Sequence, residues 1–359
     1  MDRRHLLGTL ATLGTGAIAG CSSAPNAGGD GGSGDGSDGG SGGNDGGDGS
    51  DGGGGGDDSS GGEDGGEGTT TDGGDADLYV AQAVSTLNAV ALRLNKLQDE
   101  LDSPDDVEFD QETLLEGIAD ARGELDAASE TATDAQAAQI ETLRSLATVL
   151  EELTRVVGIV LSVDPNAVVE DTTAAIDAGD YDAALSRVRA AKAKASDATD
   201  RVERAETALS GVDADRLAAV DGVEYAKVER AVTELSTLVT AFRALTVGYE
   251  ANVLGTQDLE TGRSRSEARE FEAAEAAFGD ARAHFETGDE ALAGVARDAP
   301  ENLTGAVEVA ACRTTHFVQA ATAFQDGAAD AADGNVSAAK THRDEGEAQL
   351  QQAEDCTSN

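Results

Sequence analysis

The sequence predicts an all-α fold of antiparallel helical hairpins, arranged as a bundle or a short α-solenoid, behind a disordered Gly/Asp-rich tether. Three observations lead to this prediction. Apolar residues from Asp77 onward recur at three- and four-residue spacing, Gly and Pro gather between these stretches, and no alternating strand pattern of useful length occurs. At ordinary helix lengths, residues 77–359 then hold about eight to ten helices.

Residues 1–21 are typical of a processing segment rather than of folded structure. Arg3 and Arg4 precede a mildly apolar stretch that is too short to span a membrane, and this stretch ends in Ile18-Ala19-Gly20-Cys21. The paired arginines resemble the twin-arginine export signal, and the segment ending in Cys21 resembles the lipobox of bacterial and archaeal lipoproteins. This resemblance implies lipidation of Cys21 and attachment to the extracellular face of the cytoplasmic membrane. The alternative is a plain secretory leader with an incidental cysteine.

Residues 22–76 form the predicted tether. Gly, Asp and Ser dominate this segment, which has almost no apolar side chain to offset the entropy of ordering. A Gly-rich coil of this length has a root-mean-square span of roughly 40 Å. The sequence Gly46-Gly47-Asp48-Gly49-Ser50-Asp51 matches the start of a calcium-binding β-roll repeat, but the aliphatic residue that such a repeat needs is missing. We therefore interpret the segment as a spacer.

The charge balance argues against negatively charged partners. Acidic residues number 70 against 25 Lys and Arg, for a formal net charge of −45. Such a surface repels nucleic acid and anionic lipid headgroups, so neither is an expected partner. The composition resembles that of haloarchaeal proteins, for which a screening length of about 3 Å at molar salt relieves the repulsion. An acidic cation-binding protein is the alternative interpretation.

Breaks between the predicted helices follow Pro, Gly and Asn. We place them at 102–105, 164–166, Gly211, Gly222, Gly262, 298–300 and 333–335. Between two such breaks, residues 181–209 carry an unbroken apolar stripe that is rich in alanine, which allows a neighbouring helix to approach closely. A second stripe runs from Leu303 to Ala331 through Phe317 and Phe324.

Two stretches of the chain repeat weakly, residues 134–210 and 223–295. Tyr181 and Ala184 align with Phe271 and Ala274 at an offset of 90 residues. The spacing aromatic-x-x-Ala-x-x-x-apolar-x-x-Ala resembles the second helix of a tetratricopeptide hairpin, although the 34-residue period of that family is absent. The resemblance implies helical hairpins. A plain antiparallel bundle without a repeat is the alternative.

Two cysteines besides Cys21 lie at equal distances from one predicted turn. Gly334 marks this turn, with Cys312 22 residues before it and Cys356 22 residues after it. In an antiparallel hairpin both cysteines reach the same height, so we predict a Cys312–Cys356 disulfide. Two buried free thiols are the alternative.

Other candidate site residues carry weaker signals. Asn302 and Asn335 begin N-glycosylation sequons at predicted helix breaks, where an acceptor would be exposed. His342 and Glu345 share a helix face at a spacing that a metal could use, but no second His–carboxylate pair stands nearby. Neither a nucleophile motif nor a phosphate-binding motif occurs. We therefore predict no catalytic residues, no metal and no cofactor.

The sequence leaves three functional hypotheses in order of preference. The first is a non-enzymatic binding or scaffold protein on the cell surface, held to the membrane by its lipidated N-terminus and interacting with another envelope protein or peptide. The second is a ligand-binding accessory lipoprotein of a membrane transporter, which predicts a pocket with a few converging polar groups. The third is an envelope hydrolase or metalloenzyme around His342 and Glu345.

Overall fold

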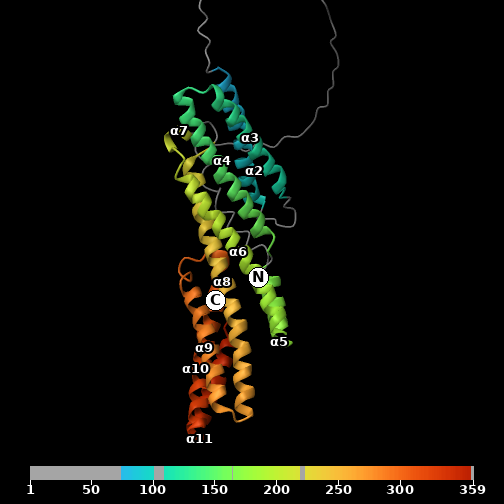
Figure 1. Ribbon diagram of the computed structural model, residues 1–359, viewed down its shortest axis with the longest axis vertical. Coiled ribbons are helices and arrows are strands. Elements are labelled where there is room, and N and C mark those ends of the chain that lie inside the picture. The colour runs from blue at the N-terminus through green and yellow to red at the C-terminus, as the bar shows by residue number, and fades with distance from the viewer. Residues whose placement is uncertain (1–73, 101–108, 164, 219–222, 357–359) are drawn as a thin grey trace, which may run out of the picture. The chain divides into compact units, whose positions relative to one another are not determined.

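Helices account for all regular secondary structure in the residues that the computed structural model describes, which are 74–100, 109–163, 165–218 and 223–356. This confirms the all-α prediction and its bundle form (Figure 1). The first five helices are α2 (Gly74–Glu100), α3 (Gln111–Thr131), α4 (Asp134–Leu161), α5 (Pro165–Asp177) and α6 (Tyr181–Leu209). The others are α7 (Ala214–Ala218), α8 (Tyr225–Glu267), α9 (Phe271–Ala293), α10 (Glu301–Ala332) and α11 (Val336–Glu354).

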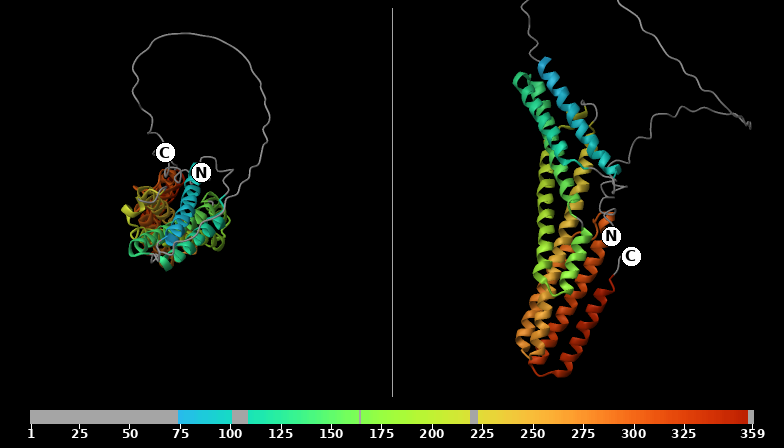
Figure 2. Two further views of the ribbon diagram at one scale, coloured as in Figure 1. Left: turned by 90° about the horizontal axis from the view of Figure 1, so that it is seen from above. Right: turned by 90° about the vertical axis from the view of Figure 1, so that its right-hand side faces the viewer.

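The long helix α8 connects two groups of helices (Figures 1 and 2). Its first half packs with α2, α3, α4 and α6 around one apolar core. Its second half packs with α9 and α10 around another, and α11 completes that group by packing on α10. At 1.5 Å per residue, the 43 residues of α8 extend over about 65 Å. The end of α9 and the start of α10 also reach the first core, so α8, α9 and α10 all contribute side chains to both cores.

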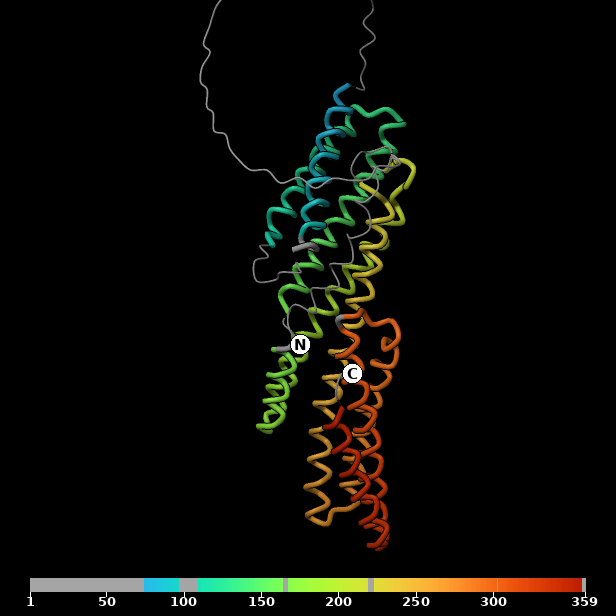
Figure 3. Tube along the Cα trace, turned by 180° about the vertical axis from the view of Figure 1, so that it is seen from behind, coloured from blue at the N-terminus to red at the C-terminus, as the bar shows by residue number. Residues whose placement is uncertain are grey.

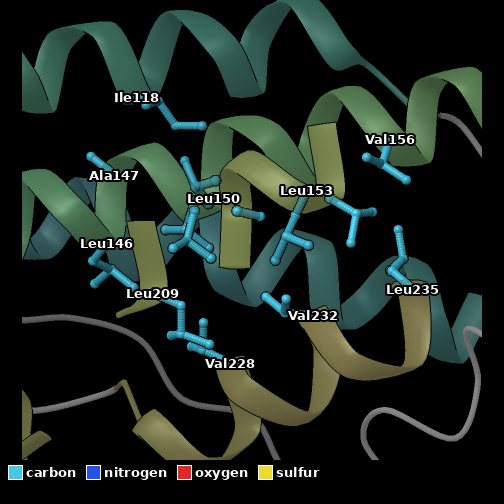
Figure 4. Close-up of a cluster of buried hydrophobic side chains, with 14 of the residues drawn as sticks. Ile118, Leu146, Ala147, Leu150, Leu153, Val156, Leu209, Val228, Val232 and Leu235 are labelled. Carbon is cyan, nitrogen blue, oxygen red and sulfur yellow. The ribbon is translucent and has the colours of Figure 1, made fainter. Parts of the chain in front are cut away.

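The first core gathers side chains from helices that are distant in sequence. Ile118 of α3, Leu150 of α4, Leu209 of α6 and Val232 of α8 converge in it (Figure 4). The apolar stripe predicted for residues 181–209 is buried along α6, where Ala184, Ala195 and Ala205 are fully covered. The small alanine side chains let α6 lie close against both α4 and α8.

Helices α8 and α9 pack by pairing glycines with large side chains, in the second core and at the adjoining end of the first core, to which Leu292 belongs. Three glycines of α8 stand seven residues apart, and each faces a bulky side chain of α9. The pairs are Gly248 with Leu292, Gly255 with Phe285, and Gly262 with Phe278. Phe285 is fully buried and Phe278 is 3% exposed. A seven-residue repeat of holes and knobs fixes the register of the two antiparallel helices.

The helix break predicted at Gly262 is wrong. Gly262 lies inside α8, and its missing side chain leaves the space that the Phe278 ring fills. A glycine in a helix interior costs about 1 kcal/mol relative to alanine, and the burial of a phenyl ring offsets this cost. Helix α2 also begins at Gly74, three residues before the predicted domain boundary, because Ala76 is already fully buried. The breaks predicted at 102–105 and Gly222 lie outside the described residues, while the others separate helices as predicted.

Three hairpins turn through the same backbone motif (Figure 3). They are the connections α5–α6, α8–α9 and α10–α11. In each, an N–H just beyond the helix reaches back to a carbonyl five residues earlier, and the residue before it has a positive φ. The positive-φ residues are Gly179 (72°), Arg269 (61°) and Gly334 (80°). The N–H···O bonds are Asp180 to Ala175 (2.8 Å), Glu270 to Arg265 (2.9 Å) and Asn335 to Asp330 (2.8 Å).

These turns bear on the predicted repeat of 134–210 and 223–295. Residues 178–181 and 268–271 make the same turn at the predicted offset, and each turn is followed by a buried alanine, Ala184 or Ala274. The preceding helices differ, because Pro165 begins a new helix where the aligned Leu254 lies inside α8. Proline lacks the N–H that would continue the helix. The repeat as a whole stays a prediction.

Candidate functional site

Several site residues predicted from the sequence lie outside the described residues. Arg3, Arg4 and Cys21 all belong to this group. The side chain of Asn302 is also outside it, although its backbone lies in the first turn of α10. Asn335 is exposed just before α11, where its amide donates to Asp330 Oδ1 (3.3 Å). Its predicted glycosylation is therefore sterically open and stays a prediction.

Cys312 and Cys356 form the predicted disulfide. Their Cα atoms lie 6.0 Å apart, and the bond joins α10 to the residues that follow α11. Gly334 occupies the turn between these helices, as the equal spacing of the two cysteines indicated. A bond between residues 44 positions apart restricts the unfolded chain and stabilises the fold by roughly 4 kcal/mol in the loop-closure model.

His342 and Glu345 do not come together with a second histidine. The ring Nδ1 of His342 faces Glu345 Oε2 at 3.3 Å, and Nε2 faces Asp330 Oδ2 of α10 at 3.4 Å. Both ring nitrogens therefore face carboxylates. In the described residues, the one group of side chains close enough to share an ion lies elsewhere, at Cys312, His316 and Cys356.

A cavity of about 680 Å³ opens between the hairpins α8–α9 and α10–α11, near their turns. We call it the hairpin groove. Its apolar lining comes from α9, α10 and α11 and consists of Phe271, Phe278, Phe324, Gly327, Ala328, Ala331, Val336 and Ala339. Its polar lining consists of Arg263, Ser266, Glu267, Lys340, Arg343 and Glu347. Neither hairpin alone would form this cavity.

Two phenylalanines form the floor of the hairpin groove. The rings of Phe278 and Phe324 stack with centroids 5.4 Å apart. Gly346 of α11 leaves room for the Phe324 ring, since a Cβ at this position would lie 2.7 Å from Phe324 Cε1. Gly262 does the same for Phe278 from α8. The glycine pairing that packs the helices therefore also positions the aromatic floor.

Three cations, Arg263, Lys340 and Arg343, outnumber two carboxylates, Glu267 and Glu347, in the polar lining, and we call these three the cationic rim. The Arg263 guanidinium carbon lies 5.2 Å from the centre of the Phe324 ring, a cation–π geometry. Within the described residues, neither Arg263 nor Lys340 makes an ion pair, and Arg343 pairs only with the neighbouring Asp344 and Glu347. At the edge, Val336 leaves 77% of its surface exposed. The floor rings are themselves buried, so the accessible apolar surface of the groove lies at its edge, at Val336, beside the positive charges of Arg263 and Lys340.

Other cations of the bundle, unlike those of the groove, form ion pairs with glutamates at helix interfaces. Three glutamates at helix interfaces each bind two cations: Glu151 binds Arg122 and Arg155, Glu152 binds Arg201 and Arg204, and Glu250 binds Arg189 and Lys192. Burial alone would raise the pKa of the Glu250 carboxyl. The hydrogen bonds from Arg189 (2.7 Å) and Lys192 (2.6 Å) outweigh burial and hold this pKa below its ordinary value. All of these cations except Arg155, which lies on the same helix as Glu151, join two helices, whereas the cations of the groove have no such partner.

The hairpin groove was not predicted from the sequence. Its lining comes from segments centred near residues 265, 275, 330 and 340, which only the two hairpin turns bring together. A partial signal was present, because Lys340 and Arg343 stand one helical turn apart on an otherwise acidic chain, four and seven residues after an exposed valine. Without the packing of α8 and α9, that signal does not distinguish a groove from a solvated helix face.

Comparison with protein-family models, with curated proteins and with solved structures gives no significant match to this chain. Separately, no helix in the described segments combines the length and the apolar character needed to cross a membrane.

Proposed function

We propose that this chain is a lipid-anchored surface protein that binds a segment of another envelope protein in the hairpin groove. The observation that carries the proposal is the cationic rim above an aromatic floor in a protein of net charge −45. Lipidation at Cys21 after export through the Arg3-Arg4 signal would hold the chain at the outer face of the membrane. The segment 22–73 would then act as the spacer between the lipid and α2.

The chemistry of the groove favours a particular kind of segment. Its apolar lining, which is exposed at Val336, takes an apolar side chain, whose burial contributes about 25 cal/mol per Å². Its rim takes a carboxylate beside that side chain, through Arg263, Lys340 or Arg343. At molar salt, charges farther apart than about 3 Å are screened, so affinity depends on apolar burial and on direct ion contacts. An apolar residue next to Asp or Glu fits both requirements.

A photo-crosslinking amino acid tests this proposal in intact cells at native salt. Benzoylphenylalanine in place of Val336, which is 77% exposed, puts the reactive group at the edge of the groove. We expect crosslinks to one protein, at a segment where an apolar residue adjoins an acidic one. Lys340→Glu/Arg343→Glu should abolish them. Lys96→Glu/Arg297→Glu reverses two exposed cations outside the groove and changes the net charge equally, so it should leave them intact.

Either of two results would count against the proposal. Crosslinks that survive Lys340→Glu/Arg343→Glu would mean that the cationic rim does not contribute to binding. Crosslinks lost equally in both charge-reversed variants would mean that total charge, rather than the groove, controls the interaction.

A second candidate function is the capture of a small amphipathic carboxylate for a membrane transporter. The observation that favours it is the cavity volume of about 680 Å³, which falls within the range typical of small-molecule sites. A thermal-shift series of aliphatic and aromatic carboxylates distinguishes the two candidates. Stabilisation that saturates with one compound and disappears in Lys340→Glu/Arg343→Glu, without a protein crosslink at position 336, would support the small-molecule function.

The anchoring step has its own test. Cys21→Ser should release the protein from membranes into the medium, and Arg3→Lys/Arg4→Lys should retain it inside the cell. Membrane retention of the Cys21→Ser protein would contradict the lipid anchor without bearing on the groove.

A further inference from the structure

His316 lies beside the Cys312–Cys356 disulfide. A nitrogen of its ring and the two sulfurs all lie within 4.8 Å of one another. Cys312 and His316 are four residues apart and therefore share one face of α10. Cys356 reaches the same place from beyond the end of α11, because the turn at Gly334 makes the two helices antiparallel. The proposed binding function uses none of these three residues.

A residue of α11 orients the His316 ring. Nδ1 of His316 lies 2.8 Å from Oε1 of Gln349, and because an amide oxygen accepts, this contact favours the tautomer in which Nδ1 carries the proton. Nε2 is then the unprotonated nitrogen with a lone pair to offer. In metal sites, a ligating histidine almost always donates its other N–H to such an acceptor, which fixes the tautomer and the ring orientation.

Two thiolates and one neutral imidazole form a ligand set that zinc uses. Zinc accepts Cys₂His with a fourth position left for water or a substrate. Tetrahedral zinc–sulfur bonds of about 2.3 Å separate two sulfurs by roughly 3.8 Å, so the metal cannot bind while the disulfide is intact. Cys312 is exposed, which gives a reductant access to the bond, whereas Cys356 is 6% exposed and His316 is half-buried. The ligands would thus be partly shielded once a metal is bound.

We propose that Cys312, His316 and Cys356 form a redox-controlled zinc site, empty when the cysteines are joined and occupied when they are reduced. A dithiol supplies the two electrons and two protons that convert the disulfide into two thiols, and it leaves as its own disulfide. Zn²⁺ then displaces the two thiol protons and binds both thiolates and Nε2 of His316. In both states a bond links α10 to the end of α11, so the hairpin stays closed while its surface gains or loses an open zinc coordination position.

Cobalt(II) is the probe for this site, since thiolate–cobalt coordination absorbs in the near ultraviolet and tetrahedral cobalt has intense visible bands. The full chain carries Cys21→Ser, which leaves Cys312 and Cys356 as its two thiols. After reduction with dithiothreitol and anaerobic desalting, we expect tetrahedral bands that saturate at one cobalt per chain and are displaced by Zn²⁺. The oxidised chain should bind neither ion.

Three variants test whether His316 is a metal ligand or only lies near the two cysteines. His316→Ala should lose the tetrahedral bands, and Gln349→Ala should weaken binding by roughly 10–100-fold, as expected for an outer-shell partner. His342→Ala changes the other histidine of this hairpin, which lies on α11, and should bind as the parent does. Circular dichroism checks that the reduced chain remains helical. Zinc should also protect both thiols from alkylation, as mass spectrometry of the peptides can measure.

Two outcomes would overturn the proposal. The first is cobalt bands in His316→Ala equal to those of the parent, which would reduce the site to an ordinary dithiol. The second is a reduced, helical chain that binds no cobalt and whose thiols alkylate at the same rate with or without zinc.

Discussion

Replacing Gly255 by alanine tests the packing principle that joins α8 to α9. A Cβ built on Gly255 would lie 2.5 Å from Cε1 of Phe285, and that ring is fully buried. A fully enclosed ring has no free space into which it could move. Overpacking of this kind costs about 1–3 kcal/mol. The substitution also gains up to about 1 kcal/mol of helix propensity, so we expect a net destabilisation of roughly 1–2 kcal/mol.

Gly123→Ala is the matched control. Gly123 also lies inside a helix, α3, but a Cβ there would meet nothing within 4 Å. The same change should therefore stabilise the protein by up to about 1 kcal/mol, because only the helix propensity changes. Urea unfolding followed by circular dichroism, at constant high salt, measures both variants. Phe285→Leu in the Gly255→Ala background should restore part of the loss, because a smaller side chain relieves the contact.

The reasoning would be refuted if Gly255→Ala were as stable as Gly123→Ala. Such a result would mean that α8 and α9 can separate slightly at no cost, and that the seven-residue spacing of the glycines does not fix the register of the two helices.

Three further predictions concern a turn, a titrating interface and the membrane anchor. Arg269 has a φ of 61° in the α8–α9 turn, so Arg269→Gly should raise the unfolding free energy by roughly 1 kcal/mol in the same assay; a decrease would contradict the strain argument. The pKa of Glu250 is lowered in the folded state, so its ion pairs with Arg189 and Lys192 stabilise the fold above the unfolded pKa. That stabilisation is lost as the pH falls through the folded pKa. Glu250→Gln should therefore cost roughly 1 kcal/mol near neutral pH and nothing in strong acid, whereas a penalty independent of pH would exclude ionisation as the cause. The mass of the mature wild-type protein should include a lipid at Cys21, and an unmodified N-terminus at a different residue would contradict the lipobox interpretation.

Local sequence signals determined the class of the fold and several helix breaks, although they did not mark the breaks at 132–133 and 268–270. The 3.6-residue periodicity placed the buried face of α6, and the Gly334 turn placed Cys312 opposite Cys356. Both signals succeed for one physical reason. A helix and its ending depend on residues within a few positions of each other, and an antiparallel hairpin with a short turn pairs positions at equal distances from that turn.

Tertiary structure alone decided the role of Gly262, the hairpin groove and the place of His316. From the sequence alone, Gly262 is typical of a helix end. In the structure it lies inside a helix, because the Phe278 ring of the next helix needs the space that its missing side chain leaves. The groove needs side chains from two hairpins, and the orientation of His316 depends on Gln349, 33 residues away. Each of these features rests on contacts between segments that are distant in the chain. Such contacts follow from the way whole helices pack, and no window of local sequence contains them.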